Sequence, residues 1–131
     1  MLTDKQKLGQ KGENLALRYL EKQGYKKVIQ NYRFGKGEID VICEYENDII
    51  IIEVKSVKVD GFGCGEERIT PKKQKMIIET TYGFLSENQQ YEDYGVRFDV
   101  VIVNFKNYPA EIVHYESAFW QNENNYLKNG Y

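Results

Sequence analysis

Four consecutive isoleucines, Ile49–Ile52, are followed directly by Glu53-Val54-Lys55, and this run constrains the fold more than any other segment. Side chains alternate between the two faces of a strand, so Glu53 and Lys55 share a face with two of the isoleucines, whereas Val54 lies on the other face. Two charged groups therefore complete a face that begins as apolar surface. Because buried charges without partners cost free energy, this placement requires partners for both groups.

The preceding segment supplies a candidate partner. Residues 38–46 have the pattern of a strand, and Asn47-Asp48 is typical of a hairpin loop. That loop would set Asp40 opposite Lys55 and diagonal to Glu53 on the same face, with the Cβ atoms of the two acids about 7 Å apart. Two carboxylates at this separation can share one divalent cation. The alternative is a plain ion pair between Asp40 and Lys55, worth up to about 1 kcal/mol when exposed; the hairpin alone does not decide between them.

Hydrophobic periodicity predicts the rest of the fold. Apolar residues at helical spacing predict a helix over 4–23, and Pro71 suits the first turn of a second helix that runs to about residue 86. Strands are predicted at 25–34, 38–46, 49–56, 96–104 and 110–116. This order predicts an α/β domain whose mixed, mainly antiparallel sheet is flanked by helices. We expect one domain over residues 1–120 and a loosely ordered tail over residues 121–131.

Charge and composition bear on partners and location. A net charge of −2 argues against a nucleic-acid partner, yet the first 36 residues hold nine Lys or Arg against three acids. Lysines on helices can equally be solvated faces. No apolar run approaches the roughly 18 residues that span a bilayer, and the polar N-terminus lacks the apolar segment of a signal peptide. We therefore expect a cytoplasmic protein with no membrane partner.

Other polar residues carry weaker signals. Cys43 and Cys64 lack Cys-x-x-Cys spacing, and a single histidine, His114, cannot complete a zinc site with them, so we expect His114 to be structural. Arg97 and Asp99 share a strand face, where they either pair with each other or brace a neighbouring site. The glycine-rich segment 61–67 lacks the Gly-Lys-Ser/Thr ending of a phosphate loop and is interpreted as a flap.

The first helix contributes a third acid. On a helical wheel of about 100° per residue, Glu13 falls between Leu17 and Leu20, within the apolar arc. An acid that faces the sheet could approach a metal ion or one of its waters. The alternative is an acid at the margin of the buried helix face, which is common.

In this order, these residues resemble the bacterial YraN-type family of uncharacterised proteins over about Gly9 to Phe119. The motifs that carry the resemblance are Gly12-Glu13-x-x-Ala16, Gly37-Glu38-Ile39-Asp40, Glu53-Val54-Lys55, Lys73-Gln74 and Arg97-Phe98-Asp99-Val100. That family is similar to the restriction-endonuclease-like nucleases, whose signature is written PD-(D/E)XK, and to archaeal Holliday-junction resolvases.

The resemblance implies a set of site residues. The implied catalytic residues are Glu13, Asp40, Glu53 and Lys55, of which Asp40 and Glu53 would bind Mg²⁺ or Mn²⁺. The resemblance also suggests Lys73 or Gln74 as a helix-borne contact to phosphate. We take Lys11 and Arg33 from the basic N-terminal third as further substrate contacts.

The resulting hypothesis is a metal-dependent endonuclease that hydrolyses phosphodiester bonds of structured or branched DNA, with DNA favoured over RNA. A cation held by two carboxylates would activate a water and offset charge on the phosphate oxygens. A homodimer is compatible with this activity, because cleavage of two strands needs two symmetric sites. A non-catalytic nucleic-acid-binding module and a protein-interaction module on the same fold remain open alternatives.

Overall fold

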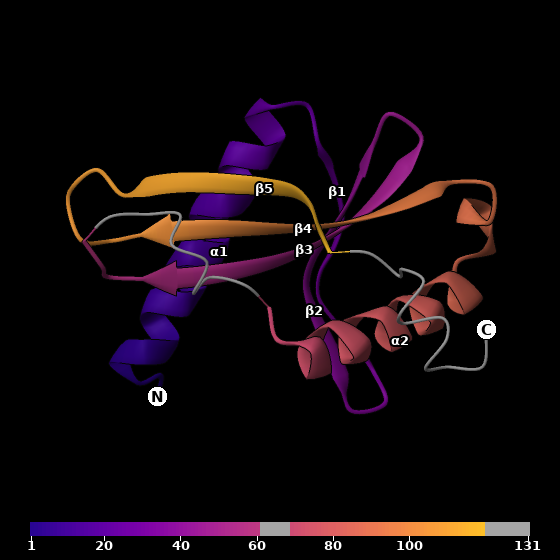
Figure 1. Ribbon diagram of the computed structural model, residues 1–131, viewed down its shortest axis with the longest axis horizontal. Helices are drawn as coiled ribbons and strands as arrows, with labels where there is room; N and C mark the ends of the chain where they lie inside the picture. Colours follow the sequence, from indigo (N-terminus) through magenta and orange to yellow (C-terminus); the bar gives the residue numbers. More distant parts are fainter. Residues whose placement is uncertain (61–68, 120–131) are drawn as a thin grey trace.

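The computed structural model describes residues 1–60 and 69–119, and its elements follow the predicted order (Figure 1). They are α1 (Asp4–Lys22), β1 (Lys26–Phe34), β2 (Gly37–Tyr45), β3 (Asp48–Val57), α2 (Pro71–Glu87), the short 3₁₀ helix η1 (Gln89–Tyr91), β4 (Gly95–Asn104) and β5 (Glu111–Phe119). The predicted flap at 61–67 and the predicted tail at 121–131 lie outside the described residues.

The five strands form one sheet in the order β1-β2-β3-β4-β5. Neighbouring strands are antiparallel except β3 and β4, which are parallel and are connected through α2. A short hairpin joins only antiparallel strands. Two parallel neighbours need a longer crossover connection, which usually contains a helix. The predicted α/β fold, with a mixed and mainly antiparallel sheet flanked by helices, is therefore confirmed.

The two helices cover opposite faces of the sheet, with α1 behind it and α2 in front of it in the view of Figure 1. Helix α1 buries Gly12, Ala16 and Leu20, a spacing of four that keeps one stripe against the strands. Helix α2 buries Ile77 and Ile78 on the other face, beside isoleucines of β2 and β3. The central strands are thus apolar on both faces, which explains the unbroken isoleucine run. No helix within residues 1–60 and 69–119 is both long and apolar enough to cross a membrane.

The hairpin between β2 and β3 differs from its prediction in register. Tyr45 pairs with Asp48, so the two-residue loop is Glu46-Asn47, and both loop residues have positive φ, 49° and 65°. Hairpin loops of this kind match the twist of the flanking strands. The predicted loop, Asn47-Asp48, was one residue too late, so the predicted pairing of Asp40 with Lys55 is wrong. The correction shifts each partner by two residues, so regular alternation is kept over the paired residues Val41–Tyr45. Ile39 nevertheless packs on the same side as Ile42, so the alternation of β2 breaks between these two residues.

Candidate functional site

The carboxylates of Asp40 and Glu53 meet where the β2–β3 hairpin opens. Regular pairing of the two strands stops at Val41 opposite Ile52, and Asp40 and Glu53 are the next residues of β2 and β3. Beyond this point Asp40 Oδ2 accepts a hydrogen bond of 2.9 Å from the Val54 amide. The Asp40 side chain thus takes over an amide that the diverging backbone of β2 no longer reaches. The two acids are therefore neighbours at the point where the strands diverge.

Burial places both carboxylates under electrostatic strain. The Glu53 side chain is 7% exposed, and desolvation together with the neighbouring Asp40 raises the pKa of Glu53 to about 7. Desolvation also raises the pKa of Asp40, against the opposing effects of the Val54 amide and of Lys73. Two acids in such a place resist ionising together unless a cation lies beside them.

Lys73 supplies part of that positive charge from α2. Its Nζ lies 3.3 Å from Glu53 Oε2, and about half of the lysine side chain is exposed. The hydroxyl of Thr70 caps the helix by accepting a hydrogen bond from the Lys73 amide at 3.2 Å, and Pro71 occupies the first turn. The cap and the proline set the start of α2, and with it the position of Lys73 over the acids.

Glu13 approaches Asp40 from the other helix. It is half-buried, and desolvation followed by the charge of Asp40 raises the pKa of Glu13. Its position depends on close packing at Gly12, where an added Cβ would lie 1.9 Å from Ser56 Oγ. Ser56 Oγ in turn donates a hydrogen bond to the Leu8 carbonyl at 3.4 Å. The predicted third acid therefore lies within electrostatic reach of Asp40 because α1 sits almost directly on β3.

The remaining predicted site residues occupy varied positions. Lys55 is half-buried on β3, next to Ile102 of β4 and on the same strand face as Glu53. Arg33, exposed on β1, forms an ion pair of 3.4 Å with Glu38. Gln74 donates a 2.7 Å hydrogen bond to the Ile69 carbonyl, so its amide is engaged at the start of α2. Lys11 lies over the Phe105 ring, 5.6 Å from its centroid, beyond the carboxylate pair along α1.

The donor set fits a hard divalent cation. Within residues 1–60 and 69–119, no three His, Cys, Asp or Glu side chains gather closely enough to hold a metal ion together. The site instead offers two carboxylates whose negative charges are only partly offset, because Lys73 lies beside one of them. Magnesium is bound in this way, by one or two carboxylates with several waters retained. Asp40 and Glu53 would be the residues that hold it.

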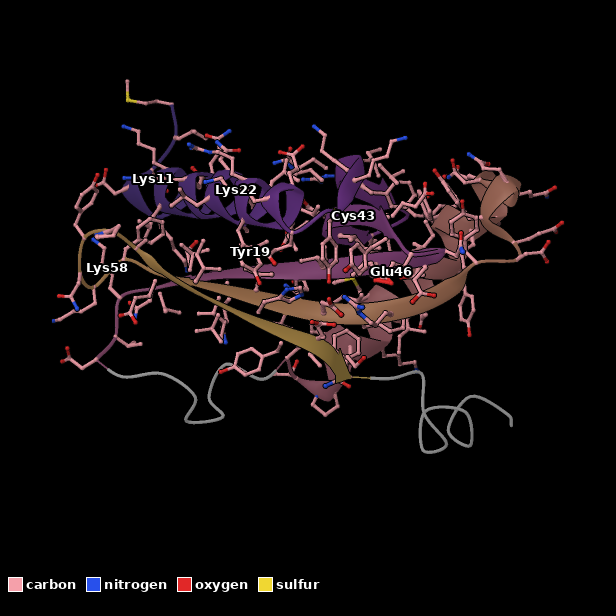
Figure 2. The ribbon with its side chains drawn as sticks, turned by 90° about the horizontal axis from the view of Figure 1, so that it is seen from above. Lys11, Tyr19, Lys22, Cys43, Glu46 and Lys58 are labelled. Carbon is pink, nitrogen blue, oxygen red and sulfur yellow. The ribbon has the colours of Figure 1, made fainter. Side chains whose placement is uncertain are left out.

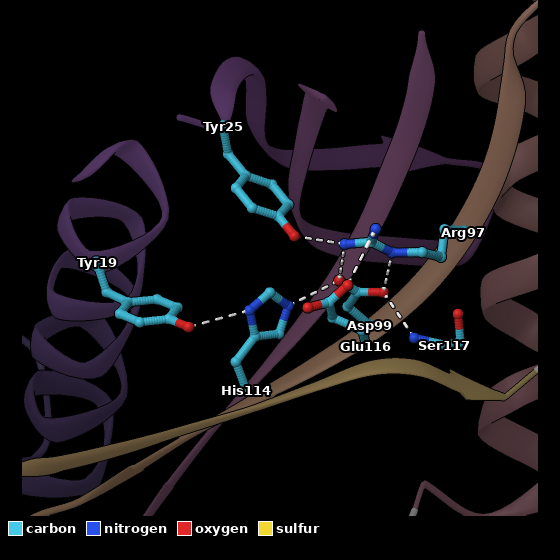
Figure 3. Close-up of polar contacts among 7 residues, drawn as sticks. All are labelled: Tyr19, Tyr25, Arg97, Asp99, His114, Glu116 and Ser117. Carbon is cyan, nitrogen blue, oxygen red and sulfur yellow. Dashed lines mark hydrogen bonds and ion pairs between the residues drawn. The ribbon is translucent and has the colours of Figure 1, made fainter. Parts of the chain in front are cut away.

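A second polar network lies on the α1 side of the sheet (Figure 3). Asp99, fully buried, accepts hydrogen bonds from Arg97 Nε at 2.9 Å and from the Ser117 amide at 3.0 Å, and its other oxygen lies 2.7 Å from His114 Nε2. His114 Nδ1 then lies 3.3 Å from the Tyr19 hydroxyl. Among the described residues no buried side-chain polar atom lacks a partner. The network is self-contained, which supports the structural role expected for His114.

Sequence reasoning weighed Arg97, Asp99 and His114 but missed the two tyrosines. Tyr25 accepts a hydrogen bond from Arg97 Nη2, and its ring stacks on Tyr45 with centroids 4.2 Å apart. The available signal was Asp99, an acid inside the otherwise apolar segment 98–103. Its partners come from residues as distant along the chain as Tyr19 and His114, so spacing could not reveal them.

Comparison with known proteins places the site in a family context. The model of a family described as "Uncharacterised protein family UPF0102" matches residues 12–103, a range that includes Glu13, Asp40, Glu53, Lys55 and Lys73. A UPF0102 protein from Sulfurihydrogenibium sp. is 44% identical over 117 residues, covering 88% of this chain and 96% of the relative. UPF0102 proteins from Acinetobacter baumannii and Phocaeicola vulgatus are 34% and 36% identical, over 96% and 91% of this chain and 95% and 97% of their own lengths.

Proposed function

This chain belongs to the uncharacterised protein family UPF0102, and we propose that it is a divalent-metal-dependent endonuclease acting on structured or branched DNA. One observation carries the proposal: Glu53 is buried and Asp40 is half-buried at the open end of a hairpin, both have raised pKa values, and Lys73 lies against Glu53. Two neighbouring acids that are partly removed from water repel each other, so the pair adds nothing to the stability of the fold.

The surrounding residues support hydrolysis of a phosphodiester. Mg²⁺ bound at the two carboxylates would supply a Lewis acid for the phosphate and a water of lowered pKa. The Val54 amide holds Asp40 in place at 2.9 Å. Lys55, on the same strand face as Glu53, would stabilise the negative charge that develops on the phosphate oxygens. Lys73, whose side chain is about half exposed, would contact a phosphate from the first turn of α2.

Glu13 has a separate part in this proposal. The charge of Asp40 contributes to its raised pKa, although no group of three acids is close enough to share one ion within the described residues. It would therefore act on a water rather than as a third direct ligand. The proposed preference for branched DNA rests on the resemblance to junction-resolving nucleases. Comparing cleavage of different DNA substrates tests this preference.

The test compares cleavage of flap, four-way-junction, single-stranded and duplex DNA, and of duplex RNA, in Mg²⁺, Mn²⁺ or EDTA. Asp40→Asn and Glu53→Gln should abolish metal-dependent cleavage, and Lys55→Met should slow it by about 10²–10³-fold. Glu92→Gln, an exposed acid after η1, is the matched control and should cleave normally. Circular dichroism checks that each variant folds. Undiminished cleavage by Asp40→Asn would refute this mechanism, whereas metal-independent binding without cleavage would favour the non-catalytic nucleic-acid-binding module.

A further inference from the structure

A lysine-lined concavity lies between the first turns of α1 and the segment that follows β3. Its volume is about 440 Å³, and it is lined by Asp4, Lys5, Lys7, Leu8, Lys11 and Lys58. We call this surface the lysine pocket. Figure 2 shows Lys11 and Lys58 at the same end of the molecule, on the two elements that bound the pocket.

The lysine pocket has little internal compensation for its charge. Four lysines face one acid, Asp4, and all four are exposed. Within residues 1–60 and 69–119, no carboxylate forms an ion pair with any of them, whereas Lys73 and Lys106 pair with Glu53 and Asp60. Four positive charges along one concavity favour a ligand that carries several negative charges.

The lysine pocket is built from α1 and the residue that follows β3, and these two elements also contribute residues near the carboxylate pair. Lys11 lies on α1, as Glu13 does, and Lys58 directly follows β3, the strand that carries Glu53 and Lys55. The helix and the strand are held together by Ser56, which donates a hydrogen bond to the Leu8 carbonyl and packs against Gly12. Lys58 follows Lys55 by three residues, or about 10 Å in extended chain. That length corresponds to about three phosphates along one strand of a duplex.

We propose that the lysine pocket binds the phosphate backbone of the nucleic-acid strand as it runs away from the Asp40–Glu53 centre. The inference takes its substrate class, nucleic acid, from the proposed function. It adds the path that the nucleic-acid strand follows across the protein surface. Lysines act on phosphate as point charges without reading bases, so this contact is independent of sequence. It supplies affinity and direction, while the carboxylate centre supplies the chemistry.

The experiment measures binding without cleavage. Fluorescence anisotropy of a labelled 30-base-pair duplex and of a four-way junction is recorded with Asp40→Asn protein over a series of KCl concentrations. The same measurement is made after adding Lys7→Gln, Lys11→Gln and Lys58→Gln to that protein. The matched control instead adds Lys22→Gln, Lys26→Gln and Lys27→Gln, which remove the same charge from exposed positions at the other end of α1 and the start of β1.

The pocket variant should bind at least about 10-fold more weakly, and the slope of log affinity against log salt should fall by about 2–3, near 0.9 for each phosphate that the protein no longer neutralises. The control should keep the affinity and slope of its parent. Equal weakening in both variants, or unchanged binding by the pocket variant, would overturn the proposal. So would retention on vesicles containing phosphatidylserine with no affinity for either DNA. If DNA binding depends on the three lysines but the native protein does not cleave DNA, the lysine-pocket proposal stands and the proposed nuclease activity is refuted.

Discussion

At the scale of single residues, the energetic conflict between Asp40 and Glu53 sets how stability depends on pH. The pKa of Glu53 is raised from 4.5 to about 7, so the folded state holds an extra proton between these values. Stability from this group is therefore greatest at low pH and decreases as pH rises from about 4.5 to 7. Glu53→Gln removes the ionisation and should stabilise the metal-free protein at pH 8 by about 1–3 kcal/mol, with little gain at pH 4.

Urea unfolding in EDTA at the two pH values measures this difference. Glu79→Gln, which changes an exposed acid on α2, is the control and should show no such dependence on pH. A Glu53→Gln variant that is less stable than its parent at pH 8 would mean that Glu53 is stabilised as a carboxylate, contrary to its burial beside Asp40.

Lys73 would compete with a metal ion held by Glu53 for the same oxygen. Its Nζ lies 3.3 Å from Glu53 Oε2, and like charges at a site for Mg²⁺ oppose each other. Lys73→Gln should therefore bind Mg²⁺ more tightly, by about 3–10-fold at pH 8, a change of about 1 kcal/mol. Isothermal titration calorimetry measures this affinity. Lys75→Gln, an exposed lysine two residues further along α2, should leave it unchanged. Weaker Mg²⁺ binding by Lys73→Gln would show that the lysine organises the acids instead of opposing the ion.

At the scale of elements, the position of α1 depends on a glycine. A Cβ at Gly12 would lie 1.9 Å from Ser56 Oγ and 3.2 Å from Ser56 Cβ, whereas one at Gly9 would meet nothing within 4 Å. Both substitutions to alanine gain up to about 1 kcal/mol of helix propensity. Gly9→Ala should therefore stabilise the protein, and Gly12→Ala should destabilise it by about 1–3 kcal/mol through overpacking.

Chemical unfolding measures both effects, and Ser56→Ala provides the second arm of a double-mutant cycle. Removing the hydroxyl should recover part of the stability that Gly12→Ala removes, because the nearest remaining atom is then at 3.2 Å. If Gly12→Ala is as stable as Gly9→Ala, α1 has room to move, and the close packing does not determine where Glu13 lies.

The elements themselves were predictable because their signals are local. Helical spacing identified α1 and its buried face, and alternation along β3 put Glu53 on the same face as Ile49 and Ile51, which is the face that α2 covers. The hairpin register was not predictable. Asn-Asp suits a turn better than Glu-Asn, yet the chain places Glu46 at positive φ, which its own preference disfavours. Pairing across the whole hairpin outweighs that local cost. The contact of Lys73 with Glu53 depends on where α2 docks, which no spacing within the sequence specifies.

At the scale of the whole molecule, the Asp99 network joins the start of β1, the edge strand β5 and helix α1 to β4. Burial alone would raise the pKa of Asp99, but hydrogen bonds from His114, Arg97 and the Ser117 amide outweigh it and hold that pKa below its usual range. Asp99→Asn should destabilise the fold by about 3–5 kcal/mol, since Arg97 loses its buried partner. Glu116→Gln, on an exposed partner of Arg97 at 3.3 Å, should cost no more than about 1 kcal/mol.

Urea unfolding at several pH values tests the role of the Asp99 charge. Because its pKa is lowered in the folded state, its stabilisation is present above the unfolded value, 3.8, and is lost only as pH falls further. The difference between the native protein and Asp99→Asn should hold from pH 7 to about 5 and shrink below pH 4. If the difference in unfolding free energy is already absent at pH 6, the network stabilises the fold through packing and not through the charge of Asp99.

Metal binding should also be visible in the stability of the entire chain, because an ion that binds only the folded state shifts the unfolding equilibrium. At a concentration 100 times its dissociation constant, Mg²⁺ should add about 2.7 kcal/mol, which differential scanning fluorimetry detects as a rise in Tm. The Asp40→Asn variant should show no rise beyond that produced by NaCl of equal ionic strength. Native protein should respond more at pH 8 than at pH 6, since Glu53 must lose its proton to bind the ion. An equal rise in both proteins would place the ion elsewhere on the molecule and would contradict its binding at Asp40 and Glu53.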